Sequence, residues 1–220
     1  MHHLRRSIGR ALAAATFCLA CAGPATALRA ADDEGFVPLF NGKDLSGWVT
    51  PDDKELFAAE DGQIVGRTKG NLKKNEFLVT DKPYGDFILK AKYKFKTGNS
   101  GIQVRSDRAA NGKVTGPQAD IGANYFGSLY EEGRRSKLLV TYPKEKGKEL
   151  FRPDDWNDMV ITAQGDHLQI SLNGMTTADI TDPAFDKSGI IALQVHVGPP
   201  MEVRFKDVMI KPLGNSAATK

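Results

Sequence analysis

From residue 36 onward, short apolar or alternating runs are separated by turn-forming residues. The runs end in Gly, Pro, Asn or Asp, and no window shows the period of about 3.6 residues typical of an amphipathic helix. The clearest alternation extends from Phe87 to Phe95, where apolar residues occupy the odd positions and lysines lie between them. Because side chains on a strand alternate between faces, one face of this strand is predicted to be buried. The rhythm as a whole predicts an antiparallel β-sandwich or barrel.

The alternating runs define the predicted strands and their connections. The strands cover residues 56–60, 63–68, 86–95, 100–106, 117–121, 137–142, 157–163, 167–172, 190–197 and 201–210. Asp61-Gly62 is expected to join the first two as a tight hairpin turn. Two connections, 122–136 and 143–156, are longer than usual, and long loops often carry function. We expect one domain over residues 36–213, a linker at 28–35 and a flexible polar tail at 214–220.

Residues 1–27 have the pattern of a secretory signal peptide. Three arginines precede an apolar run over residues 11–23, and Ala25-Thr26-Ala27 offers the small residues that a signal peptidase reads. The apolar run is shorter than the roughly 20 residues that span a bilayer, and no later segment comes close. We therefore expect an exported protein, periplasmic or extracellular, without a membrane span. Both the general secretory route and the twin-arginine route remain open.

Composition excludes several classes of partner and chemistry. The chain has 220 residues with 30 Lys plus Arg and 27 Asp plus Glu, a net charge of +3. The three arginines of the signal peptide account for this excess, so the exported chain is neutral and no nucleic-acid partner is expected. Cys18 and Cys21 leave with the same segment, which excludes a disulfide and a cysteine metal site. Two histidines remain, His167 and His196.

Three predicted strands carry a Gln and an ionisable residue two positions apart, on the face opposite their apolar residues. The pairs are Gln103 with Arg105, Gln118 with Asp120, and Gln194 with His196. One interpretation is an ordinary solvated face; the other is a concave ligand surface, which requires the three strands to be neighbours. His196 is the better candidate for a general acid or base, or else a structural histidine, whereas His167 is expected to face solvent.

The 122–136 connection gathers aromatic and charged residues, among them Tyr125, Tyr130 and Glu132. Such a cluster suits a polar, ring-shaped ligand, although its acids and arginines could equally pair with one another. No nucleophile elbow, P-loop, dinucleotide fingerprint or paired histidines at metal spacing occur in the sequence.

Several short motifs occur in the order typical of one known family. They are Phe40-Asn-Gly-Lys-Asp-Leu-Ser-Gly-Trp48, Gly98-Asn-Ser-Gly-Ile-Gln-Val-Arg-Ser106, Gly116-Pro-Gln-Ala-Asp-Ile-Gly122, Gly127-Ser-Leu-Tyr130, Trp156-Asn157 and Ile190-Ile-Ala-Leu-Gln-Val-His196. Over residues 36–213 the sequence resembles the family long called domain of unknown function 1080. Its members are described as 3-keto-alpha-glucoside-1,2-lyase, 3-keto-2-hydroxyglucal hydratase or 3-keto-disaccharide hydrolase.

The resemblance implies a concanavalin A-like lectin/glucanase jelly roll, an all-β sandwich of two antiparallel sheets with a concave site. It also implies 3-keto-glucosides or other saccharides as ligands. A ketone at C3 acidifies the proton at C2, so a base can remove that proton, expel the aglycone from C1, and leave an enone that water hydrates.

The resemblance further implies which residues lie in or near the cleft. They are Asn99, Gln103, Arg105, Gln118, Asp120, Tyr130, Gln194 and His196. Tyr125 and Glu132 of the 122–136 connection are added as candidate substrate-binding residues. His196 is the expected base, with Asp120 as the competing assignment. Arg105 is expected to stabilise the oxyanion, and Tyr130 to donate to the leaving group or stack on the sugar. The resemblance implies no definite cofactor, and Asp120 with His196 could instead hold a divalent cation that polarises the ketone.

The last motif departs from the family pattern. Many members read Gln-Asp-His-Gly there, whereas this chain has Val195 before His196 and Val197 after it. If the Asp positions the histidine elsewhere in the family, His196 needs another partner.

Two other functions compete with the enzyme, a non-catalytic carbohydrate-binding module of the same fold and a structural envelope protein. The ionisable residues Arg105, Asp120 and His196 favour the enzyme.

Overall fold

The alternating runs form strands that assemble into two antiparallel sheets in the computed structural model, which describes residues 33–122 and 124–214. The predicted signal peptide lies outside the described residues, as do most of the predicted linker and tail. Every helix and strand of the described residues belongs to the unit Gly35–Lys220, one of two into which internal contacts divide the chain.

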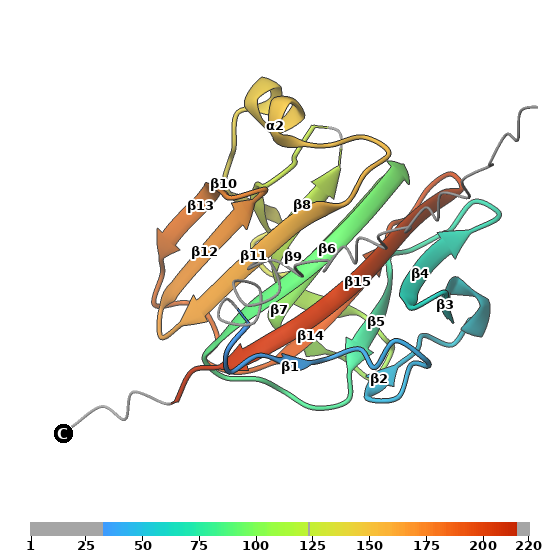
Figure 1. Cartoon of the computed structure of the whole chain (residues 1–220), viewed down its shortest axis with the longest axis horizontal. Helices are drawn as coiled ribbons and strands as arrows, with labels where there is room; N and C mark the ends of the chain where they lie inside the picture. Colours follow the sequence, from blue (N-terminus) through green and yellow to red (C-terminus); the bar gives the residue numbers. More distant parts are fainter. Residues whose placement is uncertain (1–32, 123, 215–220) are drawn as a thin grey trace, which may run out of the picture. The chain divides into compact units, whose positions relative to one another are not determined.

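The eight-stranded sheet is organised around two long central strands. Its strands follow the order β13, β12, β11, β6, β15, β4, β3, and β1 pairs with β15. Figure 1 shows β6 and β15 running side by side through this layer, although more than a hundred residues separate them in the sequence. The strands are β1 (Val37–Pro38), β3 (Phe57–Glu60), β4 (Gln63–Thr68), β6 (Phe87–Thr97), β11 (Asn157–Gln164), β12 (His167–Leu172), β13 (Met175–Thr181) and β15 (Met201–Pro212).

The seven-stranded sheet carries the predicted polar pairs. Its order is β10, β9, β8, β7, β14, β5, β2. The strands are β2 (Trp48–Val49), β5 (Glu76–Thr80), β7 (Asn99–Arg108), β8 (Val114–Gly122), β9 (Leu129–Glu132), β10 (Lys137–Val140) and β14 (Ile190–Val195). Two antiparallel sheets of this kind confirm the predicted all-β sandwich, and the jelly-roll class is supported by the comparisons given below.

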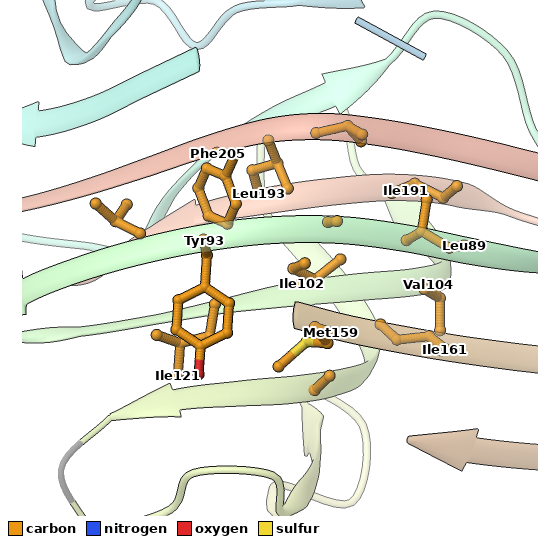
Figure 2. Packing of buried hydrophobic residues seen from close by; sticks show 14 of the residues in the cluster. Leu89, Tyr93, Ile102, Val104, Ile121, Met159, Ile161, Ile191, Leu193 and Phe205 are labelled. Atoms are coloured by element: carbon orange, nitrogen blue, oxygen red, sulfur yellow. The ribbon is translucent and has the colours of Figure 1, made fainter. Parts of the chain in front are cut away.

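The hydrophobic core fills the space between the two sheets. Figure 2 shows Leu89, Tyr93 and Phe205 of the eight-stranded sheet facing Ile102 and Leu193 of the seven-stranded sheet. All of these side chains are at most 1% exposed, so each sheet buries one face against the other. The alternation predicted for residues 86–95 is confirmed, since the odd positions are buried and the lysines are not.

The local predictions hold where turn chemistry is clear. Asp61 and Gly62 both have positive φ angles, 49° and 74°, as a two-residue hairpin turn between β3 and β4 requires. Five strands, β1, β2, β5, β9 and β13, have no counterpart among the predicted ones. The 122–136 connection, expected as a loop, contains β9, and the 143–156 connection contains a short helix, α2 (Lys144–Leu150). A 3-10 turn, η1 (Lys54–Leu56), precedes β3.

The described residues contain no helix with the length and apolarity needed to cross a bilayer.

Candidate active site

The three strands with polar pairs are neighbours, as the concave-surface interpretation requires. In the seven-stranded sheet β7 lies between β8 and β14. Gln103 of β7 stands opposite Gln118 of β8 and opposite Ala192 of β14. The apolar residues of these strands enter the core, so the polar side chains occupy the other face of the sheet.

A pocket of about 440 Å³ opens on this polar face. Its lining comes from four strands and from the segments next to β5, β8 and β14. The lining residues are Asn75, Asn99, Gln118, Asp120, Tyr125, Tyr130, Glu132, Leu138 and His196. Every residue predicted for the cleft is among them except Gln103, Gln194 and Arg105. The volume lies within the range of about 300–1,000 Å³ that is usual for small-ligand sites.

Strand β9 supplies one wall of the pocket. Tyr130 pairs with Gln118 of β8, and Tyr130 and Glu132 share a face because they are two residues apart. Glu131 between them points the other way, where its buried carboxylate accepts hydrogen bonds from Arg135 and forms an ion pair with Arg134. The acids and arginines of this segment therefore do pair, but Tyr130 and Glu132 remain in the pocket.

A buried layer of amides lies beneath the pocket. Gln118 Nε2 donates to Asp120 Oδ1 at 2.7 Å and to Gln194 Oε1 at 3.5 Å. Gln103 Nε2 donates to Gln118 Oε1 at 3.3 Å. Gln103 and Gln194 are fully buried, so they do not line the pocket but fix the amide that binds Asp120.

Gly101 leaves room for this arrangement. It stands opposite Asp120 in the ladder between β7 and β8. A Cβ atom at Gly101 would lie 2.4 Å from the side chain of Gln118. Gly101 is thus explained by the close approach of the Gln118 amide rather than by an unusual backbone angle.

Two carboxyl groups and one tyrosine hydroxyl of the pocket favour their uncharged forms. Burial raises the pKa of Asp120 to about 7, helped by the charge of Glu132 and opposed by the Gln118 hydrogen bond. Burial also raises the pKa of Glu132, against the attraction of His196 and Lys113. The pKa of the Tyr130 hydroxyl is raised by burial and by Glu132. Near neutral pH the pocket therefore holds a protonated tyrosine and a carboxyl group able to give or take a proton.

His196 follows β14 directly and presents one ring nitrogen as a base. Its Nδ1 lies 2.6 Å from the carbonyl oxygen of Val197. Because a carbonyl only accepts, Nδ1 carries the proton in this contact, and in the neutral ring Nε2 is left with its lone pair. Val195 is fully buried in the core, so the residue at the position of the family's Asp does not contact the imidazole from the pocket side.

The expectation that Arg105 lies in the cleft is wrong. The ladders of β7 with β8 and with β14 both shift register near Arg105, whose φ is 44°, which marks a β-bulge. The bulge breaks the alternation that placed Arg105 beside Gln103. Arg105 is fully buried and donates to the carbonyls of Gly85 and Gly165 and to Asp86 Oδ1, at 2.5 to 2.9 Å. Arg105 thus joins loops and does not line the pocket.

Two pocket residues escaped sequence reasoning. Asn75 ends a lysine-rich segment that resembles an ordinary loop, and Leu138 belongs to a short apolar run. Neither carries a local signal, because only the sheet order brings them to the pocket. His167 lies elsewhere, with Nε2 2.7 Å from Asp179 Oδ1 at the surface of the other sheet.

The hypothesis of a divalent cation finds little support in the donor set. Within residues 33–122 and 124–214, no three His, Cys, Asp or Glu side chains are grouped so as to hold a metal ion. A site made of Asp120 and His196 alone would lack the further protein ligands that divalent cations usually have.

Comparison with solved structures supports a jelly-roll fold. A candidate glycosyl hydrolase of Parabacteroides distasonis aligns with a TM-score of 0.63 and 24% identity, over 83% of this chain and 95% of its own. The β-glucanase of Bacillus licheniformis aligns with a TM-score of 0.57 and 11% identity, over 81% and 97%. The carbohydrate binding module CBM66 of Bacillus subtilis aligns with a TM-score of 0.53 and 17% identity, over 80% and 95%.

No protein with a curated description matches the sequence. A family match is nevertheless extensive, since residues 35–211 match the family described as the 3-keto-alpha-glucoside-1,2-lyase-like domain. This span includes every strand of both sheets except the last residue of β15, together with the whole lining of the pocket. The chain therefore belongs to the 3-keto-alpha-glucoside-1,2-lyase-like domain family.

Proposed function

We propose that this protein cleaves 3-keto-glucosides by elimination and hydrates the resulting 3-keto-2-hydroxyglucal, acting after export from the cytoplasm. Family membership supports a carbohydrate ligand. The observation that carries the reaction is one pocket containing a histidine with an available Nε2, a carboxyl group with a pKa of about 7 and a protonated tyrosine.

The elimination needs one base, one acid and one donor to the ketone oxygen. Nε2 of His196 removes the proton from C2, and the electron pair passes into the enolate at C3. The hydroxyl of Tyr130 donates a hydrogen bond to the C3 oxygen as negative charge develops there. The enolate then reforms the ketone, a C1–C2 double bond forms, and the C1–O bond to the aglycone breaks.

At the end of the elimination Asp120, half protonated near neutral pH, gives its proton to the departing oxygen. In the hydration that follows, the acid and the base exchange roles. The carboxylate of Asp120 then takes a proton from water as the water oxygen adds to C1, and protonated His196 returns a proton to C2. The cycle restores both residues, so no external proton donor is needed. Asp120 as the base and His196 as the acid is the competing assignment.

Turnover of a 3-keto-glucoside and of its unoxidised parent tests this proposal. We expect aglycone release and enone absorbance from the keto substrate alone, unchanged by a chelator. H196A should lower kcat by about 10²- to 10⁴-fold, the usual contribution of a general acid or base. H167A is the matched control and should keep full activity, because His167 lies outside the pocket. Equal cleavage of both substrates would refute elimination chemistry.

A carbohydrate-binding module is the second candidate function. Tyr125, at the edge of the pocket, is 42% exposed and can stack on a sugar ring without any reaction. The fold of CBM66 is also similar. Saccharide binding that is lost in Tyr125→Ala, without turnover of either substrate, would establish this function instead.

A further inference from the structure

The loop before β5 holds the backbone that follows His196. Leu72 and Gly198 exchange two backbone hydrogen bonds, with N–O distances of 2.9 and 3.1 Å. Three residues later, Asn75 Oδ1 accepts a hydrogen bond from the backbone N–H of Val197 at 2.8 Å. The two peptide groups after His196 are therefore both bound by residues 72–75.

These contacts set the direction of the Val197 carbonyl. The peptide that contains it is held through the N–H of Gly198, and the preceding peptide is held through the N–H of Val197. The carbonyl oxygen accepts Nδ1–H of His196 at 2.6 Å. In water a free histidine side chain favours the proton on Nε2, so this contact selects the less common tautomer, the one with a basic Nε2.

The other end of Asn75 contacts the opposite wall of the pocket. Since Oδ1 accepts from Val197, Nδ2 points to Glu132 and donates to its Oε2 at 3.5 Å. Strands β5 and β9 are separated in the sheet by three other strands. Asn75 is thus a side-chain bridge across the polar face, between the His196 segment and a carboxyl group of the site.

We infer that Asn75 is the positioning residue of His196, and that it fixes the ring tautomer by holding the His196–Val197 peptide through the N–H of Val197. The role in catalysis rests on the proposed function, whereas the role in the tautomer does not. Asn75 does not act on the substrate proton in this inference. It supplies, from a distant loop, the orientation that Val195 does not provide because that side chain is buried in the core.

Long-range ¹H–¹⁵N correlation of the histidine rings in the full chain tests this inference directly. The spectra are recorded without ligand near pH 8.5, where an ordinary histidine is neutral, and H196A identifies the His196 signals. In the wild-type protein His196 should carry its proton on Nδ1. His167 is the internal reference and should carry its proton on Nε2, which contacts Asp179.

Asn75→Ala removes the side-chain contacts to the N–H of Val197 and to Glu132. The variant should move His196 to a majority of the Nε2–H form, with His167 unchanged. Asn75→Asp keeps an oxygen acceptor for the N–H of Val197 and should retain the Nδ1–H form. Asn71→Ala, in the same loop but outside the pocket, is the control and should leave both histidines unchanged. If N75A does not fold, Asn75→Ser shortens the side chain with the same expected result.

Retention of the Nδ1–H form in N75A, or in N75S where that variant replaces it, would overturn the inference.

With a 3-keto-glucoside, N75A should lower kcat about 10- to 100-fold and change KM little, since base orientation rather than binding is affected. A tautomer change in N75A together with a wild-type protein that turns over no 3-keto-glucoside would support the positioning role and refute the proposed function.

Discussion

Asp120 is 5% exposed, and this burial disfavours the charged form of its carboxyl group even though the Gln118 amide donates a hydrogen bond to it. Its pKa is raised from an ordinary value of 3.8 to about 7. The folded protein therefore binds this proton more tightly than the unfolded chain does. Between about pH 4 and pH 7 the unfolded chain has lost the proton while the folded protein keeps it, so stability falls as pH rises.

Asp120→Asn should remove this dependence. The variant should match the wild-type protein below about pH 4 and become progressively more stable than it up to about pH 7. The difference then levels off at about 4 kcal/mol. Urea unfolding from pH 4 to pH 9 measures it, and a constant difference across that range would contradict the assignment. Turnover should nevertheless be lost, because an amide cannot exchange a proton with substrate.

Strand alternation identified much of the pocket. Gln118, Asp120 and His196 were predicted because short directional side chains occupy the face that lysines would cover on a solvated strand. Asn75 could not be predicted in this way. Its position depends on the hydrogen bonds of Leu72 and Val197 to residues more than a hundred positions away.

The bulge in β7 shows the limit of alternation within one strand. A single extra residue turns Arg105 away from Gln103 and into contacts with Gly85, Asp86 and Gly165. Strand β9 was missed for a related reason, since its four residues include two adjacent acids that lack an apolar rhythm. Only pairing with β8 and β10 makes that segment a strand.

Arg105→Met separates the two roles considered for Arg105. The structure predicts a loss of about 3–5 kcal/mol of unfolding free energy, because Asp86 and three carbonyls lose a buried cationic donor. At a temperature where the variant stays folded, kcat should be unchanged. A large fall in kcat at undiminished stability would instead support the oxyanion role. Thermal unfolding and turnover of one preparation provide both numbers.

The order of short motifs, taken over the whole chain, predicted the family and the two-sheet architecture. The pairing of strands far apart in the sequence was beyond that prediction, as the neighbours β6 and β15 illustrate. Nothing within either strand specifies the other. Their register follows from the shared need to bury Tyr93 and Phe205, which are paired in the ladder.

Because β15 contacts β1, β4 and β6, the eight-stranded sheet should not form without it. A chain ending at Pro200 is expected to lack cooperative thermal unfolding, whereas a chain ending at Lys220 should unfold in one transition. Circular dichroism on both chains checks this. A cooperative transition in the shorter chain would show that β4 and β6 form a stable sheet without β15.

The place of β15 in the chain has a consequence for biosynthesis. β15, the common neighbour of β4 and β6, begins more than a hundred residues after β6 ends, so it leaves the ribosome long after both of them. Until then β4 and β6 lack the strand that lies between them, and the middle of the eight-stranded sheet stays open while the seven-stranded sheet is being synthesised.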